Sequence, residues 1–267
     1  MKKFIIIFSL IVVILVGCTS KNTIDDKIIV VGASTSPHAQ ILEICRPYIE
    51  EAGYQLKIVE YTDYVLPNLS LQDGSLDANF FQHQPYLNQF NESNKTTLTS
   101  VLAVHFEPLG IYRGLASNLS TITKGSRIAI PNDTTNCARA LYLLAQLGLI
   151  EIDQTKGLLA SENDITSNPY EIVITALEAA SIPAQLVSFE YGIINGNYAL
   201  SSGIELTRLL ATEDPNSLAA TTYANIIAIK EGHETKPAIK VLVSALSQAI
   251  VATYILDTYN GLVLPVS

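Results

Sequence analysis

The sequence predicts an α/β protein made of two lobes with a ligand cleft between them. Short apolar segments alternate with helical segments along most of the chain, and this alternation is typical of parallel sheets covered by helices. The order of strand, small polar turn and helix occurs twice, at residues 30–38 and again at residues 128–136. Binding loops of such sheets follow the carboxyl ends of the strands, so two similar lobes can present their loops to one shared cleft.

The first round of this pattern contains three strands and two helices. We expect the strands at residues 27–31, 56–60 and 76–80, and the helices at residues 39–52 and 66–72. Gly53 and Gly74 come at the ends of the two helices, where glycine readily takes the left-handed conformation that stops a helix. These elements build the first lobe.

The second round begins after residue 126. We expect its strands at residues 127–130 and 191–194, and its helices at residues 135–147 and 182–187. Each round also has a short strand that ends in an amide-rich loop, at residues 76–79 and 193–197. The second round therefore builds a lobe that resembles the first.

Two further apolar stretches, residues 101–112 and 223–229, are interpreted as crossover strands that join the lobes. The chain after residue 236 then returns to the first lobe. The expected division places residues 28–110 and 227–267 in lobe 1 and residues 111–226 in lobe 2. Two sequential domains that are crossed only once are the alternative.

The N-terminal segment has the composition of a lipoprotein signal peptide. Lys2 and Lys3 precede an apolar run at residues 4–16, which is shorter than the roughly 20 residues of a spanning helix. The tetrapeptide that ends at Cys18 resembles the bacterial lipobox, so we expect residues 1–17 to be removed and Cys18 to be diacylated. Residues 18–26 are polar and suit a tether. A plain secretory peptide with a chance cysteine is the alternative.

The charge of the chain excludes one class of partner. The formal net charge is −9, and removal of Lys2 and Lys3 would make it −11. Nucleic-acid binding depends on clustered Lys and Arg, so we expect no nucleic-acid partner. Cys45 and Cys137 could pair in an oxidising compartment, but two separate buried thiols are the favoured interpretation.

Residues 77–86 have a composition suited to gripping a ligand. Two Phe, a His, a Tyr and several amides follow a short apolar strand, which neither a core strand nor an ordinary turn explains. We expect an apolar box with polar rims, formed by Tyr64, Phe81 and Tyr86, with His83 and His105 at its edge. Core packing is the alternative for each ring taken alone.

Arg139 is the clearest candidate for holding an anion. It lies in the first turns of the helix that begins near Thr134, after the capping residues Asn132 and Asp133, where the helix dipole disfavours a cation. A guanidinium beside a helix N-terminus suits one carboxylate held at two points. An exposed arginine paired with a surface acid is the alternative. Asn197 and Asn225 could contact an ammonium and a carboxylate, since an amide both donates and accepts.

A set of longer motifs runs from about residue 28 to the C-terminus. It comprises Pro37-His38-Ala39, Tyr61-Thr62-Asp63-Tyr64-Val65, residues 77–87, His105-Phe106-Glu107-Pro108-Leu109-Gly110, Ile130-Pro131-Asn132-Asp133, Arg139-Ala140-Leu141, Ile194-Asn195-Gly196-Asn197-Tyr198-Ala199 and Tyr223-Ala224-Asn225-Ile226. Together these motifs closely resemble the methionine-binding lipoprotein family, also called the NlpA family.

The resemblance implies a periplasmic-binding-protein-like fold that closes on methionine. It also implies delivery of the ligand to the membrane permease and ATPase of an ABC importer, with the lipid on Cys18 holding the protein at the extracytoplasmic face of the membrane. The residues that match the family pattern would surround the thioether (Tyr64, Phe81, His83, Tyr86 and His105), bind the α-carboxylate (Arg139) and fix the polar end (Asn197 and Asn225). Relatives can hold D-methionine, methionine peptides or other amino acids, so L-methionine or a close analogue is expected.

Two other functions are compatible with parts of the sequence. A zinc- or manganese-capturing lipoprotein could use His38, His83 and His105, but the chain has only four His and no paired His spacing. An enzyme could use Cys45 or Cys137 as a nucleophile, but no accompanying catalytic motif is present. We therefore expect a binding protein with no catalytic residue and no cofactor.

Overall fold

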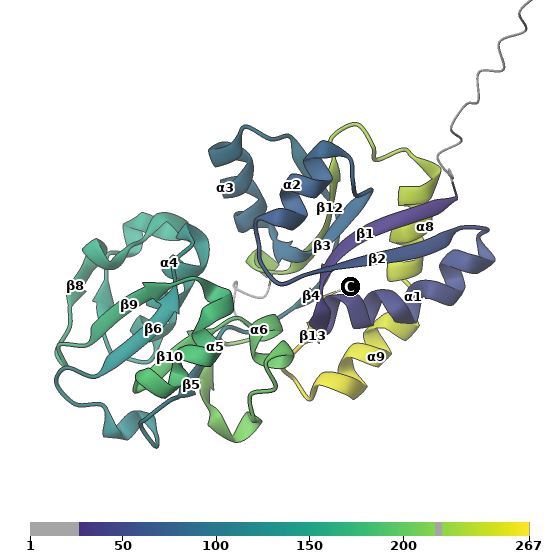
Figure 1. Cartoon of the computed structure of the whole chain (residues 1–267). Helices are drawn as coiled ribbons and strands as arrows, with labels where there is room; N and C mark the ends of the chain where they lie inside the picture. The colour runs from purple at the N-terminus through teal and green to yellow at the C-terminus, as the bar shows by residue number, and fades with distance from the viewer. Residues whose placement is uncertain (1–26, 217–220, 267) are drawn as a thin grey trace, which may run out of the picture.

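The structure of the protein is a computed structural model that describes residues 27–216 and 221–266. The expected signal peptide (residues 1–17), the lipidation site Cys18 and the tether (residues 18–26) lie outside the described residues. Two α/β lobes lie side by side, as Figure 1 shows, and each is built on its own sheet. This arrangement confirms the predicted fold class.

Lobe 1 is built on a six-stranded sheet with the strand order β13-β4-β12-β3-β1-β2. The strands are β1 (Ile28–Ser34), β2 (Gln55–Tyr61), β3 (Ala78–His83), β4 (Leu98–Phe106), β12 (Asn225–Lys230) and β13 (Leu264–Pro265). β1 runs parallel to β2 and β3, whereas β12 runs antiparallel to β3 and β4. The carboxyl ends of β1, β2 and β3 therefore meet at one edge of the sheet.

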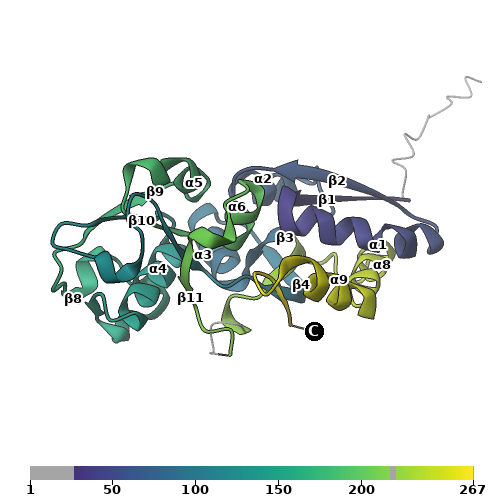
Figure 2. The ribbon, with the colours of Figure 1, turned by 90° about the horizontal axis from the view of Figure 1, so that it is seen from below.

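Helices cover both faces of this sheet. They are α1 (Gln40–Glu51), preceded by the π-helical turn η1 (Thr35–Ala39), α2 (Leu66–Asp73), α3 (Gln84–Asn94), α8 (Pro237–Leu246) and α9 (Ala249–Tyr259). α1, α8 and α9 lie next to one another, as Figure 2 shows, and bury Ile41, Leu242 and Ile255 against one face. α2 and α3 contribute Leu71 and Leu87 to a second apolar cluster.

Lobe 2 is built on a five-stranded sheet with the order β11-β5-β10-β6-β9. Its strands are β5 (Gly110–Arg113), β6 (Arg127–Pro131), β9 (Val173–Leu177), β10 (Tyr191–Ile194) and β11 (Leu209–Thr212). Its helices are α4 (Thr134–Gln146), α5 (Ile182–Gln185) and α6 (Gly196–Ser201). β6 runs parallel to β9 and β10, so α4 and α6 both begin beside the carboxyl edge of this sheet.

Short elements complete lobe 2. β7 (Glu151–Ile152) and β8 (Ile165–Ser167) form a separate two-stranded sheet. The 3-10 elements are η2 (Leu119–Thr121), η3 (Gln154–Leu159, kinked at Gly157), η4 (Glu162–Asp164), η5 (Ala179–Ser181), η6 (Leu186–Ser188) and η7 (Leu206–Arg208). The helix expected at residues 182–187 is thus shorter than predicted and continues as the tighter turn η6.

In the order of the described strands, the chain changes from one sheet to the other twice. The first passage joins β4 to β5 through residues 107–109, and the second joins β11 to β12. β5 begins at Gly110 in the second sheet, and β12 begins at Asn225 in the first. The exact division of the chain at residues 110 and 226 stays a prediction.

The third strand was predicted with the wrong limits. β3 ends at His83 rather than at residue 80, because His83 still pairs with Asn225 of β12. Helix α3 follows at once, with Pro85 in its first turn, and its cap is the side chain of His83, whose Nδ1 accepts the N–H of Tyr86. The aromatic stretch is therefore a buried strand and the first turn of a helix.

None of the described helices is by itself long and apolar enough to cross a membrane. α8 and α9 together have that length and composition, and they are bent by 50° relative to each other.

Candidate functional site

A pocket with about 330 Å³ of empty space lies between the two lobes. The lining residues come from both lobes and are Tyr64, Phe81, Gln82, His83, Tyr86, Glu107, Asn136, Arg139, Asn195, Gly196, Asn197 and Asn225. The structure thus brings together seven of the eight residues predicted to contact a ligand. The eighth, His105, does not line the pocket.

Three aromatic rings form one wall of the pocket, as the sequence predicts. The ring centroids of Tyr64 lie 5.7 Å from those of both Phe81 and Tyr86, and Phe81 and Tyr86 are 6.1 Å apart. The hydroxyl of Tyr86 donates to the carbonyl of Tyr64 at 3.0 Å, which fixes the two rings together. Tyr198 of lobe 2 stacks on Tyr64 at 4.8 Å, a contact that the sequence analysis missed.

His83 connects the aromatic wall to lobe 2. Because its Nδ1 accepts the N–H of Tyr86 at 3.1 Å, its Nε2 carries the proton and donates to Oδ1 of Asn136 at 3.2 Å. Burial, together with the charge of Arg139, lowers the pKa of His83 to about 3. The imidazole is therefore neutral and acts as a fixed hydrogen-bonding group across the cleft.

The start of α4 forms the polar wall. Asp133 caps the helix by accepting the N–H of Asn136 at 3.0 Å, as the sequence predicts. Oδ1 of Asn136 also accepts from Nδ2 of Asn195 at 2.9 Å. Within the described residues, Oδ1 of Asn195 is buried and has no hydrogen-bond partner. The pocket therefore contains one acceptor that nothing in this part of the chain satisfies.

Arg139 lies in the pocket but is already bound to an acid. Its Nε donates to Oε1 of Glu213 at 2.7 Å, and its Nη2 donates to Oε2 of Glu213 at 2.6 Å and to the carbonyl of Glu107 at 2.7 Å. The side chains of Arg139 and Glu213 are both buried. The alternative of an exposed arginine paired with a surface acid is therefore wrong. Among the described residues, Nη1 has no hydrogen bond, which leaves one corner of the guanidinium for a ligand.

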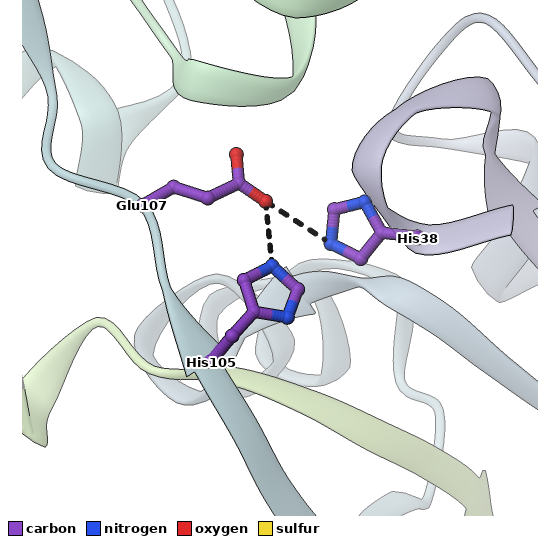
Figure 3. Close-up of side chains that lie close together, drawn as sticks. All are labelled: His38, His105 and Glu107. Carbon is purple, nitrogen blue, oxygen red and sulfur yellow. Dashed lines mark hydrogen bonds and ion pairs between the residues drawn. The ribbon is translucent and has the colours of Figure 1, made fainter. Parts of the chain in front are cut away.

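Glu107 forms a buried cluster with His38 of η1 and His105 of β4 (Figure 3). Nε2 of His105 donates to Oε1 of Glu107 at 2.8 Å, and Nε2 of His38 lies 3.4 Å from the same oxygen. Nε2 of His38 also donates to Oδ1 of Asn225 at 2.9 Å. We call these three residues the Glu107 cluster. It places His105 behind Glu107, away from the pocket.

Burial sets the charges in the Glu107 cluster. It lowers the pKa of His38 to about 4 and that of His105 to about 3, so both rings are neutral near pH 7. It also raises the pKa of Glu107, an effect that His38, a hydrogen bond from the backbone N–H of Asn197 and the charge of Arg139 partly oppose. Two neutral imidazoles therefore orient one carboxylate.

The three histidines considered as metal ligands, His38, His83 and His105, do not come together in one site. His83 caps α3 and bonds Asn136, whereas the donor atoms of His38, His105 and Glu107 lie within 4.8 Å of one another. In this cluster the neutral ring of His105 must carry its proton on Nε2, because that atom is 2.8 Å from a carboxylate oxygen. The cluster is hydrogen-bonded rather than arranged as a metal cage, and the metal-binding alternative is not supported.

The two cysteines in the described residues are free thiols. Cys45 is buried in α1, where Sγ points to the carbonyl of Ala245, and Cys137 is half-buried in α4. Burial raises the pKa of Cys45 to about 12 and that of Cys137 to about 11. Neither thiol has the low pKa of a nucleophilic cysteine.

Comparison with known proteins gives a consistent result. The family model of the NlpA lipoproteins matches residues 29–267. The methionine-binding lipoprotein MetQ of Bacillus subtilis is 34% identical over 261 residues, which covers 95% of this chain and 94% of the relative.

Two solved structures share the fold of this chain. A lipoprotein from Ruminococcus gnavus has a TM-score of 0.88 at 46% identity and covers 90% of this chain and 100% of its own. A nutrient-binding protein from Burkholderia cenocepacia, solved bound to methionine, has a TM-score of 0.84 at 32% identity. The match covers 90% of this chain and 100% of that protein. Since the family model and these relatives span nearly the whole chain, the chain belongs to the NlpA lipoprotein family.

Proposed function

We propose that this protein captures methionine outside the cytoplasm and delivers it to an ABC importer. The observation that carries the proposal is the pocket itself, which has an aromatic wall at one side and charged and amide groups at the other. Such a pocket suits a small zwitterion with an apolar tail. The methionine-binding relatives support the choice of methionine.

Each part of methionine has a complementary surface in the pocket. The thioether would lie against Tyr64, Phe81 and Tyr86, since contacts between sulfur and aromatic rings are favourable by roughly 0.3–1.5 kcal/mol each. The α-carboxylate would accept from Nη1 of Arg139. The side chains of Asn197 and Asn225 would fix the polar end of the ligand.

Closure of the lobes would retain the ligand. The hydroxyl of Tyr64 in lobe 1 donates to Oδ1 of Asn197 in lobe 2 at 2.5 Å, and the hydroxyl of Tyr198 donates to the carbonyl of Thr62 at 3.3 Å. These bonds join the two lobes directly over the aromatic wall. Residues 28–110 and 227–267 would move as one lobe and residues 111–226 as the other, with occupancy signalled by the closed form.

The lipid anchor and the transporter complete the proposal. Diacylated Cys18 would hold the protein on the extracytoplasmic face of the membrane, because two acyl chains anchor stably where one does not. The tether at residues 18–26 would let the lobes reach a membrane-embedded permease and its ATPase. We assign no catalytic residue, so the ligand is released unchanged.

Calorimetric titration tests this function. Full-length protein purified in detergent and stripped of ligand should bind L-methionine in a saturable manner with one site per chain. Parallel titrations with D-methionine and with leucine test the enantiomer and the need for a thioether. The absence of heat at tens of micromolar L-methionine would contradict the proposal.

A further inference from the structure

Building on the proposed function, we propose that the hydrogen bond between His83 and Asn136 is a latch between the lobes that acid releases. The bond joins the end of β3 in lobe 1 to the first turn of α4 in lobe 2. Protonation of His83 shifts the equilibrium towards the open form, so the protein gives up its ligand more readily when the medium outside the cytoplasm turns acidic. We call this pair of side chains the His83–Asn136 latch.

The lobe 2 half of the latch is held in one orientation. Nδ2 of Asn136 donates to both carboxylate oxygens of Asp133, at 3.0 and 3.1 Å, and the backbone N–H of Asn136 donates to Oδ1 of Asp133 at 3.0 Å. With Nδ2 bound in this way, Oδ1 of Asn136 points to Nδ2 of Asn195 at 2.9 Å and to Nε2 of His83 at 3.2 Å. Because an amide oxygen only accepts, the latch requires a proton on Nε2 of His83.

The lobe 1 half of the latch has no place for a second proton. Nδ1 of His83 accepts the backbone N–H of Tyr86 at 3.1 Å and so caps helix α3. A proton on Nδ1 would point at this N–H, and the cap would be lost. The neutral ring, with its proton on Nε2, is therefore the form that fits between the lobes.

Lobe 2 adds burial and a positive charge around His83. Its side chain is 5% exposed, and its ring lies 5.2 Å from the ring of Tyr223, which lies 4.5 Å from the guanidinium carbon of Arg139. Burial first, and then the charge of Arg139, which its pairing with Glu213 reduces but does not remove, lower the pKa of His83 to about 3. Arg139 and Asn136 both belong to α4, so opening of the cleft takes the charge away and exposes the ring to water. The pKa of His83 rises as a result, and protons bind the open form in preference.

The other ionisable groups that face His83 do not drive release. Tyr86 and Tyr223 stay uncharged, because burial raises the pKa of each. Burial also raises the pKa of Asp133 and that of Glu107. An acid whose pKa is raised in the closed form takes up its proton more readily there, so these two carboxylates oppose release by acid rather than cause it.

His38 and His105 lie deeper in lobe 1 than His83. Both rings pack on Phe80 of β3, with ring centroids 4.6 and 5.2 Å away, and both bond or approach the carboxylate of Glu107. Because Phe80 belongs to lobe 1 itself, opening of the cleft changes the surroundings of these two rings less than those of His83. The latch histidine is therefore the one whose protonation follows the movement of the lobes.

NMR titration of the histidine rings tests the latch on the unaltered protein. The chain has four His, and the ring signal of His83 can be assigned from its contacts with Tyr86 and Tyr223. In full-length protein held in detergent and stripped of ligand, His83 should titrate at a pH at least about 1 unit higher than in the same protein saturated with L-methionine. His233, which lies outside the buried core, should titrate at the same pH in both. A titration of His83 that methionine leaves unchanged or moves upwards would overturn the inference.

Calorimetric titration with L-methionine at pH 7, 6 and 5 gives the second arm of the test, since the ligand stays zwitterionic over this range. The affinity of the wild-type protein should fall about three- to tenfold from pH 7 to pH 5, because the open form takes up a proton that the closed form does not. His83→Gln keeps an amide N–H for Asn136 but cannot take up that proton. Its affinity, whatever the value at pH 7, should therefore change less than about twofold.

The matched control for this variant is His233→Gln, which should show the same fall in affinity as the wild type. A wild-type affinity that does not fall by pH 5 would overturn the inference. A fall of the same size in His83→Gln as in the wild type would overturn it as well, because the proton would then bind elsewhere.

The outcomes distinguish the latch from the proposed function. Failure of the wild-type protein to bind L-methionine at pH 7 would overturn both. Binding at pH 7, with an affinity that acid does not change and a His83 titration that methionine does not change, would overturn only the latch. The NMR measurement and the wild-type calorimetry need no variant, so the inference can be contradicted even if His83→Gln does not fold.

Discussion

Arg139 and Glu213 form a buried ion pair with two parallel hydrogen bonds, Nε to Oε1 at 2.7 Å and Nη2 to Oε2 at 2.6 Å. Oε2 of Glu213 also accepts the N–H of Leu109 at 2.8 Å, and Nη2 of Arg139 donates to the carbonyl of Glu107. The pair therefore ties helix α4 to both passages between the lobes, at residues 107–109 and at residue 213. The guanidinium that faces the pocket is held rigidly by this arrangement.

Replacement of Glu213 should destabilise the protein strongly. Glu213→Gln leaves the charge of Arg139 buried without its partner, which typically costs about 3–5 kcal/mol of unfolding free energy. Urea denaturation followed by circular dichroism measures this cost. The control is Glu190→Gln, which breaks the exposed pair with Arg127 and should have a much smaller effect. Similar losses of unfolding free energy in Glu213→Gln and Glu190→Gln would show that Glu213 does not neutralise Arg139.

Arg139→Lys should weaken methionine binding by at least about tenfold. A lysine keeps the positive charge, but a single ammonium cannot hold Glu213 at two points, bond the carbonyl of Glu107 and still present a donor to the ligand. Calorimetric titration of wild-type and variant protein measures the change. An affinity equal to that of the wild type would mean that the guanidinium does not contact the ligand.

Tyr64→Phe should weaken ligand binding by roughly three- to tenfold, the value of one hydrogen bond. The variant removes the bond to Asn197 across the cleft but keeps the aromatic ring. The control is Tyr86→Phe, which removes a hydroxyl that bonds Tyr64 within the same lobe and should have a smaller effect on affinity. An equal effect of the two variants would argue against the bond between the lobes as a closing contact.

The stability of the protein should fall as the pH is lowered from about 6.5 towards 4. His38, His83 and His105 have folded-state pKa values of about 4, 3 and 3, below their unfolded value of 6.5. The unfolded chain therefore binds more protons than the folded chain between pH 6.5 and pH 4. Each buried histidine lowers the free energy of unfolding by up to about 1.4 kcal/mol for each unit by which the pH falls. The raised pKa of Glu107 acts in the opposite direction and reduces the total slope.

Denaturation at several pH values tests this dependence. His105→Gln should reduce the slope between pH 6.5 and pH 4, because one buried imidazole no longer has to be protonated on unfolding. His233→Gln is the control, since this histidine lies outside the buried core and should change the slope little. A flat stability profile in the wild-type protein would contradict the neutral, buried state of the three histidines.

Local patterns in the sequence predicted the fold and most of the pocket. The alternation of strands and helices gave both lobes, and Asp133 caps α4 as expected. The aromatic residues after position 80 were expected to follow the end of a strand, whereas β3 continues to His83. The polar side chains of β3 are satisfied internally, since Nδ2 of Asn79 donates to Oδ1 of Asn68 and Nδ2 of Asn68 donates to Oε1 of Gln82. Only the folded structure reveals this network.

The residues that the sequence analysis missed depend on long-range contacts. Glu213 lies 74 residues from Arg139, and no local motif marks it as the partner. Glu107 and His105 are two residues apart on an extended segment, so their side chains point to the same side and bond each other, but only Glu107 lines the pocket. The sequence alone could not decide which of the two contacts the ligand.

A crystal structure of the full-length protein bound to L-methionine tests the proposed site. The thioether should lie against Tyr64, Phe81 and Tyr86, and the carboxylate should accept from Nη1 of Arg139. Methionine bound outside this pocket, or with its carboxylate turned away from Arg139, would show that this is not the binding site.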